Sequence, residues 1–539
     1  MATINPGIIG TKLLYAFEGK GALPDSILQA IRDQGIAGVT LFRDLNVSSP
    51  QQVRDLTAAL QNIAAQAGQL PLLIAADQEG GQLMAINGTT PLPGNMALGA
   101  TQSEELAYQT GKVLALELSA MGINVNYAPS MDVNNNPQNP VIGVRSFGAD
   151  PLLVGKFGAA LISGSQDHGV VACAKHFPGH GDTAGDSHHM LPTVPHDRTH
   201  LESVEFPPFL AAFREEVQMV MTAHLTLPAL EPEEDTPATL SRILLTDLLR
   251  STFHYNGVTI TDAMNMKAIQ QGNGLAVEAM AAFRAGADIL LMGPDVVDQN
   301  LVYENTLLAA KRGFLDVKEL EQSAERVFAM RAGIREHFVQ PDLSMIKCDE
   351  HLQIARQIAE KSITLLRNDA NLLPLKLNKQ KRIVVLLPKP VDLTPADTSS
   401  YVKLSLLPLI KKEHTNVIEM QYNMQPDDVE INAILQQTQA DDLIVIGTIN
   451  ARQHPGQAKL VKTLLNTFGS DQIISVALRL PDDVLFFSQV KTALCTYSIL
   501  EPSLQALVNV VFGHLTTKGR LPVPIGDLYS IGYGIGYVS

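Results

Sequence analysis

Residues 170–183 read VVACAKHFPGHGDT. The first part, Val170–Lys175, is a short continuous apolar run, which is typical of a parallel strand covered on both faces. The second part is a polar loop shaped by a proline and glycines. Barrel enzymes carry their reactive side chains where such buried strands end. The stretch therefore predicts a barrel strand that leads directly into a functional loop.

Seven more apolar runs of this kind alternate with amphipathic helical stretches, at Leu13–Phe17, Gly38–Phe42, Leu72–Asp77, Ile123–Ala128, Gln218–Ala223, Gly257–Asp262 and Ala287–Met292. Helix start signals lie between the runs: Ser49 and Pro50 precede one helical stretch, and Asp316 precedes another. Eight successive β/α units predict an α/β fold with a (β/α)8 TIM-type barrel over residues 1–340. An open, doubly wound parallel sheet is the alternative.

The alternation of apolar runs and helical stretches is interrupted after the predicted barrel. We expect an interdomain linker over residues 341–380, which includes a helix through His351–Ile363. Residues 381–539 show a second alternation, which predicts a smaller three-layer α/β sandwich domain. Its strands are expected at Arg382–Leu387, Leu443–Ile446 and Ile473–Ala477, and its helices at Val429–Gln437, Gly456–Thr467 and Pro502–Gly513. Because no glycine-rich phosphate loop opens any unit, a nucleotide site is not supported.

Composition excludes several classes of partner. The 539-residue chain carries 40 Lys and Arg against 55 Asp and Glu, a net charge of −15. This acidic balance argues against nucleic acid and anionic membranes as partners. Three widely spaced cysteines form neither a disulfide framework nor a zinc cluster, which fits a reducing compartment. Without a leader-like segment before Lys12 or a long apolar run, we expect a cytoplasmic protein, acting as a monomer.

Polar side chains gather at the ends of other predicted strands as well. Asp77 ends one strand, His224 follows another, and Asp262 ends a third. A charged group at the end of a buried strand is costly unless it is paired or takes part in chemistry. For Asp262 the sequence leaves two interpretations: a catalytic carboxylate, or a structural one that caps the next helix.

The loop Lys175–His188 holds the densest group of reactive side chains. Asp186 and His188 are two residues apart, so the carboxylate can orient the imidazole for proton transfer near neutral pH. The spacing favours this dyad. A metal site is the alternative, with ligands from His176, His180, Asp182 and His188. The third possibility is a solvated loop with no chemical role.

The same residues resemble the signature of glycoside hydrolase family 3 β-N-acetylglucosaminidases. The loop motif Lys175–Thr183 with Asp186 and His188 carries the likeness most specifically. Other similar motifs follow the family's order, namely Asp77–Gly81, Val141–Gly148 and Ile260–Met264, with Ser362–Leu375 and Gly519–Ile525 resembling its two-domain members. The resemblance covers nearly the whole chain.

The resemblance implies a retaining glycosidase that needs neither metal nor cofactor. Asp262 would be the nucleophile that forms a glycosyl-enzyme intermediate, and His188, oriented by Asp186, would be the acid/base. The terminal sugar would be held by four further residues, Asp77, Arg145, Lys175 and His176. Family glucosidases usually take their acid/base from a second-domain glutamate. The dyad makes that glutamate unnecessary here, so we expect the second domain to be supportive or to shape the aglycone side.

Several of these residues also have structural interpretations. Arg145 is a candidate partner for Asp132 or another carboxylate, and Lys175 is a candidate to neutralise Asp262 or Asp77. For three more polar residues, His180, Asp182 and His224, the sequence leaves open whether they support the site.

The expected substrate is small. With no tryptophan and 5% aromatic residues, a long stacking groove for polysaccharide is not expected, and an exo-acting pocket fits better. By family, the substrates would be short glycans with terminal β-linked GlcNAc, such as muropeptides in peptidoglycan recycling, hydrolysed by a β-N-acetylhexosaminidase. The alternatives are a β-N-acetylglucosaminide phosphorylase, a β-glucosidase of the same fold, and a non-catalytic sugar-binding protein.

Overall fold

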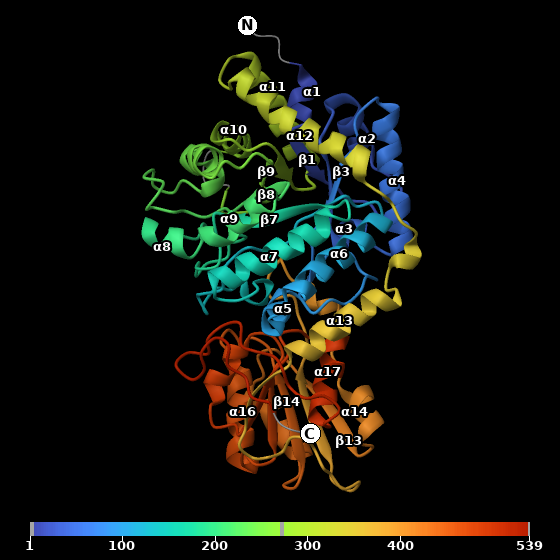
Figure 1. Cartoon of the computed structure of the whole chain (residues 1–539), viewed down its shortest axis with the longest axis vertical. Coiled ribbons are helices and arrows are strands. Elements are labelled where there is room, and N and C mark those ends of the chain that lie inside the picture. The colour runs from blue at the N-terminus through green and yellow to red at the C-terminus, as the bar shows by residue number, and fades with distance from the viewer. Residues whose placement is uncertain (1–4, 270–273, 537–539) are drawn as a thin grey trace.

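The computed structural model describes residues 5–269 and 274–536. Residues 1–4, part of the segment expected to carry no leader, lie outside these ranges. Figure 1 shows two domains joined end to end, the first in blue to yellow and the second in orange to red.

The predicted strands of the first domain form one eight-stranded parallel sheet in the order β10-β1-β2-β3-β6-β7-β8-β9. An isolated parallel bridge between Ile260 and Ile289 brings its two ends together. The sheet is therefore a barrel, which confirms the prediction and excludes an open doubly wound sheet. Its strands are β1 Leu13–Ala16, β2 Gly38–Leu41, β3 Leu73–Ala76, β6 Val125–Asn126, β7 Val171–Phe177, β8 Met219–Thr222, β9 Val258–Thr261 and β10 Leu290–Met292.

Helices surround the barrel and begin where the sequence signals predict. Ser49 Oγ accepts a hydrogen bond from Gln52 N at 3.2 Å at the start of α4, and Asp316 accepts one from Lys318 N at 2.8 Å at the start of α12. The helices are α1 Pro6–Gly10, α2 Asp25–Gln29, α3 Arg43–Asn46, α4 Pro50–Gln66, α5 Asn95–Thr101, α6 Glu104–Ala120, α7 Pro151–Gln166, α8 Arg198–Ser203, α9 Phe206–Arg214, α10 Leu275–Ala285, α11 Val296–Lys311 and α12 Val317–His337. A small hairpin, β4 Gln78–Gly80 with β5 Leu83–Met84, follows β3.

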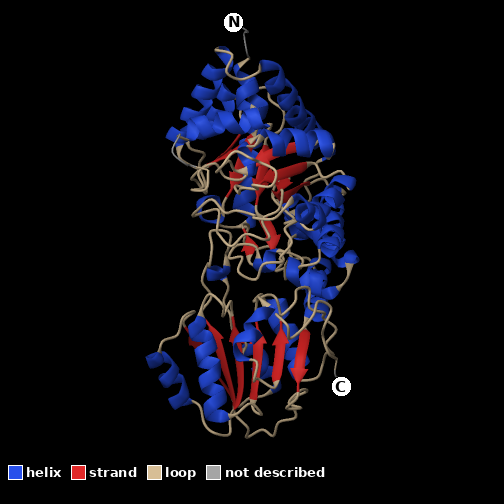
Figure 2. Cartoon of the chain, turned by 90° about the vertical axis from the view of Figure 1, so that its left-hand side faces the viewer, coloured by secondary structure: helices blue, strands red, loops and turns tan. Residues whose placement is uncertain are grey.

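The second domain is a six-stranded sheet in the order β11-β16-β15-β14-β12-β13, with helices on both faces (Figure 2). This confirms the three-layer sandwich. Its strands are β11 Thr364–Asn368, β12 Ile383–Pro388, β13 Val417–Tyr422, β14 Leu443–Thr448, β15 Ile473–Ala477 and β16 Thr492–Cys495. Its helices are α14 Leu407–Glu413, α15 Asp428–Gln437, α16 Pro455–Phe468 and α17 Glu501–Val511, preceded by α13 Asp349–Ser362.

The segment expected to be a linker, residues 341–380, does more than connect the domains. Its strand β11 pairs antiparallel with β16 and forms one edge of the second sheet. Its helix α13 contacts α5 and α6 of the barrel and α17 of the second domain. The sequence prediction placed this strand outside the sheet because its partner follows more than a hundred residues later.

Charged side chains are buried at the amino-terminal end of the barrel. The carboxylate of Asp288 is fully buried. It forms ion pairs with Arg250 Nη2 at 2.6 Å and with Arg326 Nη2 at 2.7 Å. Lys12, directly before β1, donates to the carbonyl oxygens of Ala287 at 3.1 Å and Asp288 at 3.0 Å, and burial lowers its pKa to about 7. This end of the barrel is tied together by one carboxylate and the cations around it.

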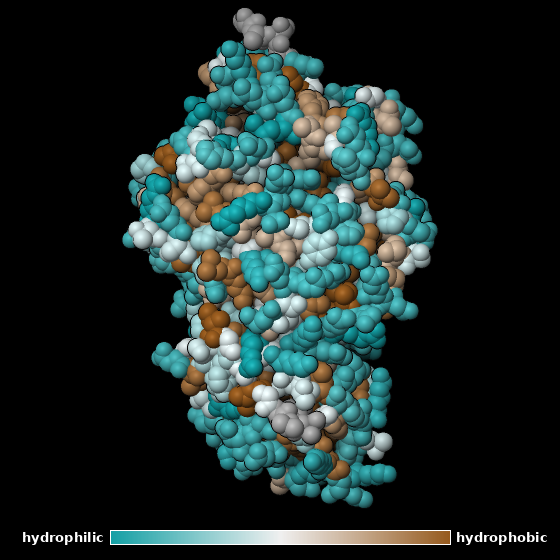
Figure 3. Space-filling model, viewed as in Figure 1, coloured by the Kyte–Doolittle hydropathy of each residue, from teal (hydrophilic) through white to brown (hydrophobic). Residues whose placement is uncertain are grey.

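The length and hydropathy of the described helices decide whether any of them meets what a membrane span requires, and Figure 3 shows how polar one face of the molecule is. Among the residues that the structure describes, no helix is both long and apolar enough to cross a bilayer. Hydrophilic residues cover most of the face in Figure 3, and the apolar ones form small separate groups.

We expect Asp288→Ala to lower the free energy of unfolding of the barrel by about 3–5 kcal/mol, because it leaves buried cations without their counter-charge. Equilibrium urea unfolding measures this change. Asp471→Ala is the matched control, since it breaks an exposed pair with Lys491 at 2.8 Å and costs at most about 1 kcal/mol. If the urea midpoint of unfolding fell equally in the two variants, Asp288 would not be the stabilising counter-charge that we assign.

Candidate active site

A cavity of about 440 Å³ opens at the carboxyl ends of the barrel strands. Such an end is where barrel enzymes place their sites. Six of the seven site residues predicted from the sequence line this cavity: Asp77, Arg145, Lys175, His176, His188 and Asp262. The seventh, Asp186, contacts His188. The structure therefore brings the whole predicted set to one place.

Asp262 follows β9 directly and points its carboxylate into the cavity region. Its Oδ1 accepts a hydrogen bond from the backbone N of Ala263 at 2.7 Å. Burial raises the pKa of Asp262, but the nearby His224, His176 and His188 outweigh burial and hold the pKa at about 2. The carboxylate is therefore ionised at neutral pH, as a nucleophile requires.

Asp186 and His188 form the hydrogen-bonded pair that their spacing predicts. Asp186 Oδ1 lies 2.7 Å from His188 Nδ1 and accepts from the His188 backbone N at 2.9 Å. Burial raises the pKa of Asp186, but its hydrogen bonds from His188 outweigh burial and lower it. The carboxylate fixes the imidazole by Nδ1 and leaves Nε2 for proton transfer.

Two acids and two bases form a compact ionic group beside them. Lys175 Nζ lies 2.5 Å from Asp77 and 2.6 Å from Glu79. Arg145 makes a bidentate pair with Glu79 at 2.7 and 3.0 Å. Burial raises the pKa of Glu79, but Arg145 and Lys175 outweigh it and bring the pKa to about 2. The four charges balance. Asp77, with 25% of its side chain exposed, is the most accessible of the four.

The orientation of His176 depends on Asp132, a fully buried carboxylate after β6. Asp132 Oδ2 lies 2.7 Å from His176 Nδ1, and Oδ1 accepts the backbone N of His176 at 3.2 Å and of His180 at 2.7 Å. Asp132 therefore pairs with His176 rather than with Arg145. Because Nδ1 is taken, the other ring nitrogen of His176 is the one available to a ligand.

His180 and His224 hydrogen-bond to segments that carry the site residues, and His180 also lines the cavity. His180 Nε2 lies 3.1 Å from Ser187 Oγ, between the two members of the dyad. His224 Nε2 lies 3.2 Å from the carbonyl oxygen of Ala263, next to Asp262. Burial lowers the pKa of both rings, to about 4 for His180, where His176 adds to the effect. Both rings act as hydrogen-bonding supports of the site.

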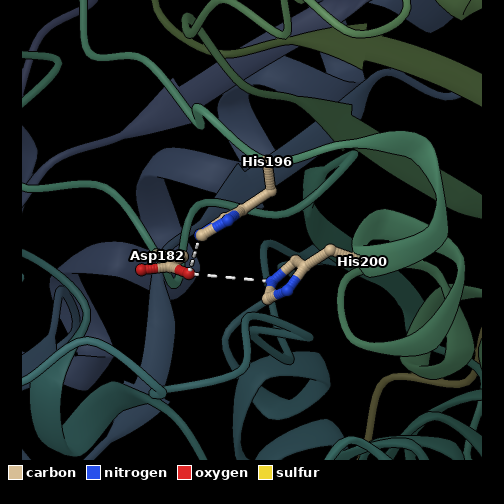
Figure 4. A group of neighbouring side chains, drawn as sticks. All are labelled: Asp182, His196 and His200. Carbon is tan, nitrogen blue, oxygen red and sulfur yellow. Dashed lines mark hydrogen bonds and ion pairs between the residues drawn. The ribbon is translucent and has the colours of Figure 1, made fainter.

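The predicted metal-ligand set does not assemble as a unit. His176 and His180 use ring nitrogens on Asp132, Thr183 and Ser187. Asp182 instead bonds His196 Nε2 at 2.5 Å and lies near His200, a separate group drawn in Figure 4. Within residues 5–269 and 274–536, Asp182, His196 and His200 are the one group of three with metal-ligand geometry.

One loop of the second domain, residues 392–401, completes the cavity wall. Thr398 holds it to the barrel, with its N and Oγ1 donating to the carbonyl oxygen of Gln82 at 2.8 and 2.9 Å. The Tyr401 hydroxyl donates to Asp44, and Arg43 stacks 3.9 Å from the Tyr401 ring centre. The second domain thus contributes directly to the cavity.

Sequence reasoning missed Glu79, the role of Asp132 and the loop 392–401. Glu79 stands in the quoted motif Asp77–Gly81, and Asp132 follows a predicted strand, so the strand-end rule contained a signal for both. Only the tertiary structure shows that Glu79 lies between Arg145 and Lys175. The loop 392–401 carries no signal that links it to a cavity in another domain.

Comparisons with known proteins agree with this architecture. The sequence profile described as Glycosyl hydrolase family 3 N terminal domain matches residues 16–330, and that of the family 3 C-terminal domain matches residues 363–537. The chain is 32% identical to Beta-hexosaminidase A of Pseudoalteromonas piscicida over 561 aligned residues, which cover 93% of this chain and 91% of the relative.

Solved structures show the same likeness. A glycoside hydrolase family 3 beta-N-acetylglucosaminidase from Paenibacillus sp. str. FPU-7 is 37% identical and superposes with a TM-score of 0.90, over 97% of this chain and 99% of that one. A beta-glucoside phosphorylase bound to 2FGlc superposes at 0.83 over 97% of this chain and 95% of that one, with 23% identity, and shows the fold alone. Both domain profiles and these relatives together span nearly the whole chain, so the chain belongs to glycosyl hydrolase family 3 and is a glycoside hydrolase.

Proposed function

We propose that this glycoside hydrolase is a retaining exo-β-N-acetylglucosaminidase. One observation carries the proposal: an ionised carboxylate, Asp262, and a carboxylate-oriented imidazole, His188, line the same small cavity. Retaining hydrolysis needs these two functions, a nucleophile and an acid/base, on either side of the scissile bond.

The first half of the reaction forms the covalent intermediate. Asp262 attacks the anomeric carbon, and the bond from that carbon to the leaving oxygen breaks. His188, as imidazolium, gives its Nε2 proton to that oxygen, so the departing sugar leaves as a neutral alcohol. Asp186 stabilises the imidazolium through Nδ1.

The second half releases the sugar. His188, now neutral, accepts a proton from water at Nε2 while the water oxygen attacks the anomeric carbon. The bond to Asp262 breaks and its electron pair returns to the carboxylate. The proton gained restores the imidazolium, and two displacements at one carbon retain the β configuration.

The ionic group of Asp77, Glu79, Lys175 and Arg145 is proposed to hold the terminal sugar, together with His176. Asp77 accepts from sugar hydroxyls, and Lys175 and Arg145 donate to them. The second ring nitrogen of His176, Nε2, lies 3.5 Å from Arg145 Nη2 and is the ring atom left to contact the sugar. Glu79 is the positioning residue among them, because it fixes both cations and is itself buried.

The cavity suits one terminal sugar. Its size lies at the small end of ligand pockets, and the loop 392–401 closes one side. Val141, Met221 and Met266 add apolar surface for the ring face or an acetyl methyl group. Two of the relatives described above are named as a hexosaminidase and an N-acetylglucosaminidase, which favours terminal β-linked GlcNAc as the sugar. Short glycans such as muropeptides are the proposed substrates.

We propose further that the enzyme acts in the cytoplasm. All three cysteines, Cys173, Cys348 and Cys495, are free thiols. Free thiols suit a reducing compartment.

Asp262→Asn should lower turnover by roughly 10⁴-fold, because the amide cannot form the covalent intermediate. Steady-state kinetics with an aryl β-N-acetylglucosaminide measures the loss, and NMR of the wild-type product should show the β anomer first. Asp247→Asn, an exposed aspartate on the barrel surface, is the matched control and should leave turnover unchanged. A folded Asp262→Asn protein with near-normal activity, or an α anomer formed first, would overturn the nucleophile assignment.

His188→Ala should reduce kcat/KM by about 10²–10⁴-fold for substrates with poor leaving groups. The loss should be much smaller for activated aryl glycosides, whose leaving group needs little protonation. His337→Ala, at an exposed histidine in the last turn of α12, is the control and should leave both rates unchanged. Equal losses on both kinds of substrate would contradict the acid role.

The pH profile of His188→Ala gives a second readout. On the activated substrate its kcat/KM should lose the pH dependence that His188 contributes in the wild type, because the acid/base group is gone while Asp262 keeps His224 and His176 beside it, which lower its pKa. An unchanged pH profile would contradict the acid/base assignment of His188.

The sugar and the acceptor are tested together. In phosphate-free buffer, chromophore release should be far faster from an aryl β-N-acetylglucosaminide than from the matching β-glucoside. Added phosphate should not raise the rate or yield a sugar 1-phosphate. A phosphate-dependent rate would instead support a phosphorylase, which the neutral imidazole favours since it repels an incoming anion less than a carboxylate does. Preference for the glucoside would indicate a β-glucosidase, and a folded protein inactive on both would indicate a sugar-binding protein.

A further inference from the structure

Three side chains meet on the outer side of the loop that carries the dyad. Asp182 comes from that loop, His196 from the segment after it, and His200 from α8 (Figure 4). Asp182 Oδ2 lies 2.5 Å from His196 Nε2 and 3.7 Å from His200 Nε2. The two imidazole rings stack with their centres 3.8 Å apart. The proposed function uses none of these three residues.

We propose that Asp182, His196 and His200 form a binding site for a divalent transition-metal ion of the zinc class. Two imidazoles and one carboxylate are ligands that zinc prefers. One potential ligand atom from each residue lies within 4.8 Å of the other two. A movement of about 1 Å separates Asp182 from His196 enough for metal bonds of about 2.0–2.2 Å to form.

His200 is prepared to act as a ligand. Its Nε2 is buried and has no hydrogen-bond partner among the residues that the structure describes. An imidazole nitrogen without a hydrogen-bond partner is open to a metal ion as its partner.

Asn135 gives an independent observation at the same place. Its Nδ2 lies 3.2 Å from Asp182 Oδ2, while its Oδ1 is buried without a partner in the described part of the chain. The two ends of an amide are assigned from the hydrogen bonds around them. A cation beside Asp182 would favour the flipped amide, which turns the unpartnered oxygen toward the ion as a fourth ligand.

The site is separate from the catalytic cavity. None of Asp182, His196 and His200 lines that cavity. Asp182 nevertheless precedes Asp186 by four residues in the same loop. A bound ion would therefore tie the base of this loop to α8 and hold the dyad in place, which is a structural role and not a step in catalysis.

Metal binding to the full-length protein tests the proposal directly. Protein stripped with chelator is dialysed against zinc, and the bound zinc is measured by elemental analysis; cobalt(II) serves as a visible probe of the same site. We expect about one equivalent of zinc per chain, and a rise in melting temperature when zinc is added. His196→Ala and His200→Ala should each weaken binding by more than about 100-fold and abolish the rise.

His514→Ala is the matched control. His514 pairs with Glu413 at 2.9 Å in the second domain, and that pair has no third ligand in a metal-binding arrangement within the described ranges. This variant should bind zinc like the wild type. Should an alanine variant fail to fold by circular dichroism, His200→Gln keeps the side-chain size and removes the ligand.

Three results would overturn the proposal: no bound zinc in the wild type, equal zinc content in wild type and His200→Gln, or loss of zinc in His514→Ala. Metal content is measured without substrate. Failure of this proposal is therefore distinguishable from failure of the proposed hydrolase function.

Discussion

One buried carboxylate, Asp132, determines how the loop after β7 is folded. It is fully buried and accepts hydrogen bonds from the ring and backbone of His176, from the backbone of His180 and from Ser130 Oγ at 2.8 Å. A buried charge is tolerated only when its oxygens are satisfied in this way. These bonds fix His176 and His180, and His180 in turn contacts Ser187 between the two members of the dyad. Asp132, in the segment after β6, therefore helps to position the dyad.

Charge balance explains how so many ionisable groups share one end of the barrel. The carboxylates of Asp77 and Glu79 are matched by Lys175 and Arg145, which leaves that side of the cavity close to neutral. Among the described residues, no Lys or Arg forms an ion pair with Asp262. The imidazoles around Asp262 keep its pKa low. Its carboxylate is therefore ionised without a permanent ion pair to a Lys or Arg, and it remains available for bond formation.

The fold was predictable where local signals suffice. The eight barrel strands are short apolar or β-branched runs, most of them continuously apolar, and each was predicted from that pattern. Strand β13, at a sheet edge, and the short β16 lack such a run, and β11 depends on a partner distant in sequence. The contacts of the site likewise include some that follow from local sequence and some that do not. Asp186 and His188 are neighbours in the chain and their pairing followed from spacing, whereas the contacts of Glu79 arise only when separate segments fold together.

The loop 392–401 makes the cavity a shared property of both domains. Its contacts to Gln82 and Asp44 in the barrel form the same wall that a bound sugar would touch. Occupancy of the cavity and docking of the domains are therefore linked equilibria, in which each favours the other by the same free energy.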